Sequence, residues 1–359
     1  MIAYWLVAFL TLLLHKILPC YNKTEYLRNL IIAFSPLFVY GAIRVNYGQD
    51  YPAYEIMFDI FHDFNGFSAD VDAHAEIGYQ LLCYIMPSYR SILVVNALLL
   101  AAAFVTFIYK NVPSRYAWLA IVLIYLMPEK NVFGSLVGIR NGLVVTSFIL
   151  VFSFVQERKP IHLIITALLL STIHTSAIAY LPLAYVVSRN TSVTKKEVYI
   201  WLVAGVVLMV ASMSTLVNLL LPIFSVIANR YEDMLAEMHD ESRGLLNYSA
   251  NIVMMFAFIY FAYRRNDELL PAQKSLLRMA ALYCVSGCLG AISGRMTYYY
   301  AIYYIGGIVL MYSYRWKQNV LRVAMIMFVI LIACYATFVV WMGSQWWNHD
   351  AYHSLLDDF

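Results

Sequence analysis

The sequence predicts an all-α, polytopic integral membrane protein. Of the 359 residues, 62% are hydrophobic and only 13% are charged. Apolar runs of roughly the 20 residues needed to cross a bilayer recur from one end to the other. The longest polar intervals, 44–90 and 222–247, are too short to build a separate core, so we expect them to be outer loops or membrane-surface elements. The whole chain, 1–359, is therefore expected to form a single transmembrane domain.

About 12 helical segments follow from the apolar runs. The run at residues 1–14 has no basic n-region and no small-residue cleavage site, which predicts a retained first helix with its N-terminus outside. The expected segments are 1–18, 30–43, 91–109, 116–128, 134–155, 161–173, 175–188, 198–221, 248–263, 277–293, 297–313 and 320–342.

The distribution of charge supports this assignment. With both termini outside, the inner loops receive 17 of the 24 basic residues and the outer loops 16 of the 21 carboxylates, as the positive-inside rule requires. Residues 161–188 are continuously apolar but have basic clusters at both ends, so a single crossing would break the pattern. Two short legs joined by a turn near His174 restore it. This hairpin places His174 close to the outer surface.

Seven basic residues do not obey the rule, and six of them are arginines, whose planar fork suits bidentate contact with phosphate or carboxylate. Arg140 is expected about six residues inside the helix 134–155, roughly 9 Å deep. A buried arginine costs several kcal/mol unless it meets an anion or water, so by default it marks a site. The structural alternative is a salt bridge to an outer-loop carboxylate such as Glu76. The seven exceptions are Arg44, Arg90, Lys130, Arg140, Arg230, Arg243 and Arg295.

The loop 44–90 contains an amphipathic helix. Its apolar side chains lie at 54, 57, 58, 61 and 64, opposite Glu55, Asp59, His62 and Asp63, which is helical spacing suited to the outer leaflet and to roofing a cavity. The acidic run 70–72 is expected to be solvated rather than to bind metal.

Four motifs in this order, "RVNYGQDYPAY", "EIGYQ", "GIRNGL" and "HTSAIAYLP", resemble the EpsG-like, Wzy-type polysaccharide polymerases of bacterial envelopes. Gln49 and Asn141 depart from the family pattern, where threonine and glutamine are common. The resemblance implies a glycosyltransferase-C-like helical fold in the bacterial cytoplasmic (inner) membrane. It also implies transfer of a growing glycan from undecaprenyl pyrophosphate to the terminal sugar hydroxyl of another lipid-linked repeat unit, at the outer face.

Under this resemblance Arg140 and Arg295 would bind the pyrophosphate, and Arg44 would assist them or fix the loop motif. The base is left open among His174, Glu76 and Asp50. His174 is favoured because an unperturbed imidazole has a pKa of about 6.5 and accepts protons near neutrality. Five side chains are expected to bind the glycan: Tyr51, Tyr54, Tyr79, Tyr299 and Arg243. The alternative for the four tyrosines is an aromatic belt at the membrane interface.

The implied partners are the lipid-linked oligosaccharide and the bilayer, and the resemblance also allows a chain-length regulator and a flippase as partners. No cofactor, metal or nucleic acid is expected. A lipid-linked oligosaccharide flippase or other transporter is one alternative, although it would be expected to show internal repeats and charges near the midplane. A membrane acyltransferase is another, with His15 as its candidate. A non-enzymatic scaffold does not need Arg140.

Cysteine-accessibility labelling tests the predicted topology. Single cysteines near Asp63 and Asp350 should react with an impermeant reagent from outside, and those near Lys195 and Asp267 only from inside, because the charge distribution assigns them so. Labelling near Lys195 from outside would contradict the hairpin and move His174 away from the outer surface.

Overall fold

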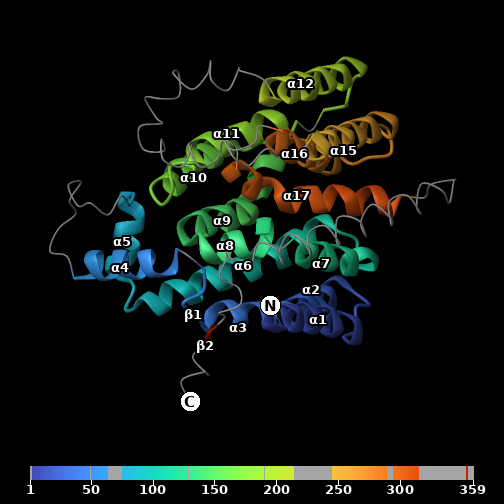
Figure 1. Cartoon of the computed structure of the whole chain (residues 1–359). Helices are drawn as coiled ribbons and strands as arrows, with labels where there is room; N and C mark the ends of the chain where they lie inside the picture. The colour runs from blue at the N-terminus through green and yellow to red at the C-terminus, as the bar shows by residue number, and fades with distance from the viewer. Residues whose placement is uncertain are drawn as a thin grey trace. The chain divides into compact units, whose positions relative to one another are not determined.

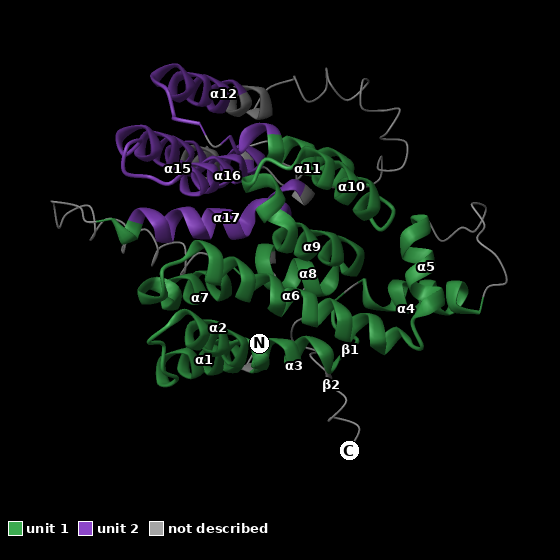
Figure 2. Ribbon diagram, turned by 180° about the vertical axis from the view of Figure 1, so that it is seen from behind, with its two compact units in different colours: residues 1–185, 312–359 green, residues 186–311 purple. Residues whose placement is uncertain are grey.

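The computed structural model of the chain describes residues 2–48, 50–63, 75–127, 129–189, 191–213, 245–288, 294–314 and 353–354. Over these residues the fold is almost entirely α-helical, as the sequence predicts (Figure 1). The chain divides into two compact units, residues 1–185 with 312–359 (unit 1) and residues 186–311 (unit 2), coloured separately in Figure 2. The single transmembrane domain stays a prediction.

Unit 1 contains most of the helices and the motifs singled out above. Phe34 separates α2 from α3, where Pro36 cannot donate a backbone hydrogen bond, so the predicted segment 30–43 is in fact interrupted. The elements are α1 (Ile2–Ile17), α2 (Lys23–Ala33), α3 (Ser35–Ala42), β1 (Arg44–Val45), α4 (Tyr51–His62), α5 (Ile77–Ile85), α6 (Tyr89–Asn111), a 3-10 helix (Ser114–Tyr116), α7 (Ala117–Leu126), a π-helix (Glu129–Phe133), α8 (Gly134–Val137), α9 (Ile139–Gln156), α10 (Pro160–Ser171), α11 (Ala177–Val187) and β2 (His353–Ser354).

The predicted helix 134–155 is also broken, and this corrects the expected depth of Arg140. Gly138, with φ −81° and ψ 76°, interrupts the helix between α8 and α9. Gly142 then packs directly on α8, since an added Cβ would lie 2.1 Å from the Ser135 carbonyl oxygen. Arg140 is therefore the second residue of α9, in its first turn, and the depth of roughly 9 Å inside a continuous helix is wrong.

Two helices of the described residues, α6 and α9, are long and apolar enough to cross a membrane. A third span results if residues 114–126 and 130–137, which meet at 83°, are one broken crossing. The other apolar helices are shorter. The count of about 12 segments and the orientation of the termini stay predictions, and the segment 320–342 lies outside the described residues.

The hairpin within 161–188 is present as two short helices, α10 and α11, separated by residues 172–176 with His174 at the centre. α4 is the amphipathic helix that the loop pattern predicts. Its apolar face, however, packs on α5, α6 and α9 in a buried aromatic cluster that we call the tyrosine core. This core consists of Tyr51, Tyr54, Phe58, Phe61, Tyr79, Cys83, Tyr89, Ile92, Leu93, Ile139 and Leu143.

Near the C-terminus, β2 pairs antiparallel with β1, with Arg44 opposite Ser354 and Val45 opposite His353. Residues 353–354 and the loop motif after α3 therefore lie side by side. In a membrane this pairing is compatible only with an even number of crossings between them.

Unit 2 is a bundle of helices that approach closely at glycines. A Cβ added at Gly205 would lie 2.4 Å from the Met255 methyl carbon, and one at Gly307 would lie 2.7 Å from the Ala280 Cβ. Glycine at such contacts lets helix backbones pack closely, as is common between membrane helices. The elements are α12 (Lys195–Met213), α15 (Leu245–Arg264), α16 (Pro271–Cys288) and α17 (Gly294–Ser313).

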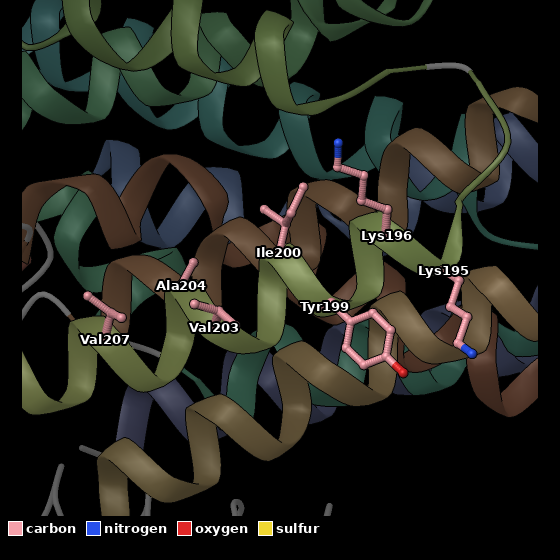
Figure 3. Close-up of a pocket in the computed structure, with 7 residues that line it drawn as sticks. All are labelled: Lys195, Lys196, Tyr199, Ile200, Val203, Ala204 and Val207. Carbon is pink, nitrogen blue, oxygen red and sulfur yellow. The ribbon is translucent and has the colours of Figure 1, made fainter.

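One face of α12 carries an open pocket of about 750 Å³, shown in Figure 3. Lysines lie at its N-terminal end and aliphatic side chains along its length. An apolar helix face with lysines at one end is typical of a helix that reaches a membrane surface. With no acid, histidine or thiol in its lining, this pocket is not the candidate catalytic site. Its lining residues are Lys195, Lys196, Tyr199, Ile200, Val203, Ala204 and Val207.

A buried ion pair joins α12 to α16. The Arg278 fork donates from Nε and Nη2 to the two oxygens of Glu197, at 2.6 and 2.8 Å. Nη1 also donates to the carbonyls of Arg189 and Thr191 at the start of the unit. The Arg278 side chain is 1% exposed and that of Glu197 is 24% exposed.

Arg278→Ala should lower the free energy of unfolding by about 3–5 kcal/mol, because it leaves Glu197 without its buried partner. Arg265→Ala, which breaks the exposed pair with Glu268, is the matched control and should cost about 0–1 kcal/mol. Denaturant titration in detergent micelles measures both. Equal, small losses would show that the buried pair does not hold unit 2 together.

Candidate active site

The loop motif after α3 is held by two arginines. Arg44 is fully buried, and its guanidinium donates to the Gly41 carbonyl and, over 3.1 Å, to the Leu136 carbonyl. Arg90 donates to the carbonyls of Ala42 and Arg44, at 3.1 and 2.6 Å. Carbonyls at a helix C-terminus lack intrahelical donors, and these side chains supply them.

Of the two roles that the sequence left open for Arg44, the geometry therefore favours fixing the loop. Direct contact with pyrophosphate stays a prediction for this residue. Arg90, which the sequence did not assign to the site, has a comparable supporting role.

The predicted sugar-binding tyrosines of unit 1 are interior residues. Tyr51, Tyr54 and Tyr79 are all buried in the tyrosine core. The rings of Tyr54 and Tyr79 have their centroids 5.8 Å from the Arg140 guanidinium carbon, one in α4 and the other in α5. Aromatic rings at this distance attract a cation through their π-electrons. Both rings thus contact Arg140 and also each other, and glycan binding by them and by Tyr51 stays a prediction.

Arg140 pairs with Glu76, which is the structural alternative that the sequence offered. Arg140 Nη1 lies 2.7 Å from Glu76 Oε2, and the two side chains are 18% and 20% exposed. A cation in the first turn of a helix lies at the positive end of the helix dipole, which disfavours it. Arg140 therefore depends on its carboxylate and ring neighbours, while the remaining exposure leaves the pair open to a ligand.

Glu76 is the residue that joins the parts of the site. It precedes α5, and its Oε1 accepts hydrogen bonds from the Thr175 backbone N–H at 3.0 Å and from the Thr175 hydroxyl at 3.3 Å. Burial raises the pKa of the Glu76 carboxyl, but backbone N–H bonds from Thr175 and Glu76 itself and the nearby charge of Arg140 outweigh it. The net pKa lies below its usual value of 4.5, so Glu76 is ionised at neutral pH.

His174 is buried in the turn between α10 and α11. Its Nδ1 accepts the Ser176 backbone N–H at 3.2 Å and lies 2.8 Å from the Ser176 hydroxyl oxygen. Because a backbone N–H can only donate, Nδ1 holds the lone pair and the neutral ring carries its proton on Nε2. In this tautomer His174 is a hydrogen-bond donor through Nε2. The basic lone pair is then the one on Nδ1, which faces Ser176, and action as a base through Nε2 would require exchange of the tautomer.

The remaining predicted residues lie in different places. Asp50 directly precedes α4, half-buried, and its charge acts on the Tyr54 hydroxyl. Arg295 is the second residue of α17 in unit 2, and Tyr299 is buried in the same helix. Their meeting with Arg140 stays a prediction. Arg243, like most of the second outer loop 222–247, lies outside the described residues.

Unit 1 thus brings together Arg140, Glu76 and His174, with Thr175 as their link. We call these four residues the Glu76 junction. Sequence reasoning missed Thr175 and Ser176, although both belong to the quoted "HTSAIAYLP". It also missed Gly78, whose N–H donates to the Thr172 carbonyl at 2.7 Å and ties α5 to the same turn. No group of three metal-ligating side chains occurs within the described ranges.

Comparison with known families gives one match. The family model described as the EpsG family matches residues 27–351, which include all four quoted motifs. No curated protein matches the chain, and no solved structure does.

Gly78→Ala should disrupt the Glu76 junction without unfolding the chain. A Cβ there would lie 2.2 Å from the Thr172 hydroxyl oxygen and 2.7 Å from its carbonyl oxygen, so α5 must move away from the turn. A displacement of about 1 Å at a site can cost about 10² in rate. Ala53→Ser, on the exposed side of α4, is the control. Unchanged product formation by Gly78→Ala, at equal protein level, would show that this junction does not position the chemistry.

Proposed function

The chain belongs to the EpsG family, and on that premise we propose that it is a polysaccharide polymerase of the cytoplasmic membrane. It transfers a growing glycan from undecaprenyl pyrophosphate to the terminal sugar hydroxyl of another lipid-linked repeat unit, at the outer face. The family match and the apolar helices together fit a membrane protein of polysaccharide biosynthesis.

The observation that supports this reaction best is the partly exposed Arg140, held between two tyrosines with an ionised carboxylate and a histidine beside it. A glycosyl donor whose leaving group is pyrophosphate needs cations where negative charge develops, and an acceptor hydroxyl needs a base within hydrogen-bond reach. The Glu76 junction supplies a cation, Arg140, and two candidate bases, Glu76 and His174. Each of them lies within a few residues of a helix end.

In the proposed reaction Arg140 binds the pyrophosphate and stabilises its charge as it leaves, and Arg295 is the second guanidinium expected there. Fork-shaped contacts explain arginine rather than lysine at these positions. Of the three candidate bases, Glu76 gains support over His174, because the hydrogen bond from Ser176 makes the imidazole a donor through Nε2.

The two alternative functions have less support. His15, the acyltransferase candidate, contacts the Asn29 side-chain oxygen at 2.6 Å through Nδ1, and the Asn29 amide donates to the His15 carbonyl at 3.0 Å. These contacts join the end of α1 to α2, as expected of a structural histidine. A flippase is expected to use charges near the bilayer midplane, whereas the Glu76 junction lies at helix ends.

Purified protein incubated with a lipid-linked repeat unit should produce a ladder of longer lipid-linked glycans. Arg140→Lys should lose nearly as much product as Arg140→Ala, because an ammonium keeps the charge and loses the bidentate fork. Arg265→Lys, in an exposed pair of unit 2, is the matched control and should retain the ladder. A flippase would give no ladder from the wild type, and a normal ladder from Arg140→Lys would mean that charge alone suffices.

A further inference from the structure

Glu76 and the pyrophosphate of the donor would compete for Arg140. The proposed function assigns it to the pyrophosphate, yet in this structure Nη1 is paired with Glu76 Oε2 at 2.7 Å. We propose that the two contacts are successive steps of one cycle: the donor's pyrophosphate displaces Glu76 from Arg140, and the released carboxylate accepts the proton of the acceptor hydroxyl. This inference rests on the proposed function and adds to it the substrate-triggered release of the base.

The geometry of the pair makes this exchange accessible. Both side chains are about one-fifth exposed, and a single nitrogen–oxygen contact joins them. Partly exposed pairs of this kind contribute a factor of about five or less to an equilibrium. A pyrophosphate diester carries two negative charges and offers several oxygens to a guanidinium fork, so it is the stronger partner for Arg140.

Arg140 itself does not need to move during the exchange. Tyr54 and Tyr79 approach its guanidinium from two helices of the tyrosine core, with both ring centroids at 5.8 Å. Cation–π contacts of this type persist when the anionic partner changes. The Arg140 guanidinium is therefore already positioned for whichever anion binds to it.

Glu76 also stays in place when Oε2 is released. Its other oxygen, Oε1, remains hydrogen-bonded to the backbone and hydroxyl of Thr175. The freed Oε2 thus lies beside the phosphate that Arg140 has taken, and so beside the sugar carbon bonded to that phosphate. Loss of the ion pair with Arg140 and the approach of an anion both raise the pKa of Glu76, and its burial acts in the same direction. A carboxylate with a higher pKa is a better base.

The chemical step needs only the donor, the acceptor, Glu76 and Arg140. The acceptor hydroxyl oxygen forms a bond to the anomeric carbon and gives its proton to Glu76 Oε2. The bond between that carbon and the phosphate oxygen breaks, and the electron pair leaves with undecaprenyl pyrophosphate, whose charge Arg140 stabilises. When the carrier departs and the proton is lost to solvent, Glu76 can pair with Arg140 again.

Glu76→Gln tests the exchange, with binding and turnover measured separately. Binding of geranylgeranyl pyrophosphate to the full chain in nanodiscs should become tighter, by up to about fivefold, because the competing carboxylate is gone. The glycan ladder should fall by about 10² to 10⁴, the contribution of a positioned base. Arg140→Gln should lose the binding. Glu55→Gln, the same change of charge on the exposed face of α4, should alter neither measurement.

Glu76→Asp provides a second variant that keeps the carboxylate. Its shorter side chain should weaken the pair with Arg140, so pyrophosphate binding should again tighten, while more of the ladder survives than with glutamine. Geranylgeraniol, which lacks the pyrophosphate, should bind all variants equally.

Weaker pyrophosphate binding by Glu76→Gln, at an unchanged melting temperature, would overturn the proposal, since Glu76 would then only position Arg140. A full ladder from Glu76→Gln would overturn it too and pass the role of base to His174 or Asp50. If the wild type itself makes no ladder, the proposed function fails. Tighter binding by Glu76→Gln would then still identify an anion exchange at Arg140, without the proton transfer.

Discussion

The candidate site depends on the carboxylate of Glu76 and its position between three segments of the chain. One oxygen pairs with Arg140 at the start of α9, and the other accepts hydrogen bonds from Thr175 in the turn between α10 and α11. The residue itself directly precedes α5, which the tyrosine core holds against α4 and α6. Without this carboxylate, Arg140, at the positive end of a helix dipole, would lose its ion pair with Glu76, and the turn carrying His174 would lose one of its ties to α5.

Much of this arrangement follows from sequence patterns that have a physical cause. Apolar runs predict α6 and α9, the positive-inside rule predicts the hairpin of α10 and α11, and the 3–4 spacing from Tyr54 to Phe61 predicts α4. Charge placement alone singles out Arg140, and Glu76 is the carboxylate that the structural alternative gives as an example of its partner. These features depend on local sequence patterns or on the side of the membrane that charged residues prefer. Both can be recognised in a single sequence.

The parts that sequence could not predict depend on contacts between distant segments. The break at Gly138 moves Arg140 into the first turn of α9, and it occurs where Gly142 packs closely on Ser135. In the sequence, a tyrosine near an expected membrane boundary has the same pattern whether its side chain faces water, lipid or protein. In the structure Tyr51, Tyr54 and Tyr79 face the core. The donor role of His174 comes from one backbone N–H, that of Ser176, which only the folded turn brings to Nδ1.

The chain contains two arginine–glutamate pairs whose geometry differs in a way that separates support from chemistry. Arg278 binds both oxygens of Glu197, is almost fully buried, and also donates to two carbonyls, so every contact favours one fixed arrangement. Arg140 meets Glu76 through one contact, keeps part of its surface exposed, and lies at a helix end where its charge is disfavoured. The weaker, more open pair is the one suited to exchanging its anion, and this contrast within one molecule is the physical reason to seek the reaction at Arg140 rather than at Arg278.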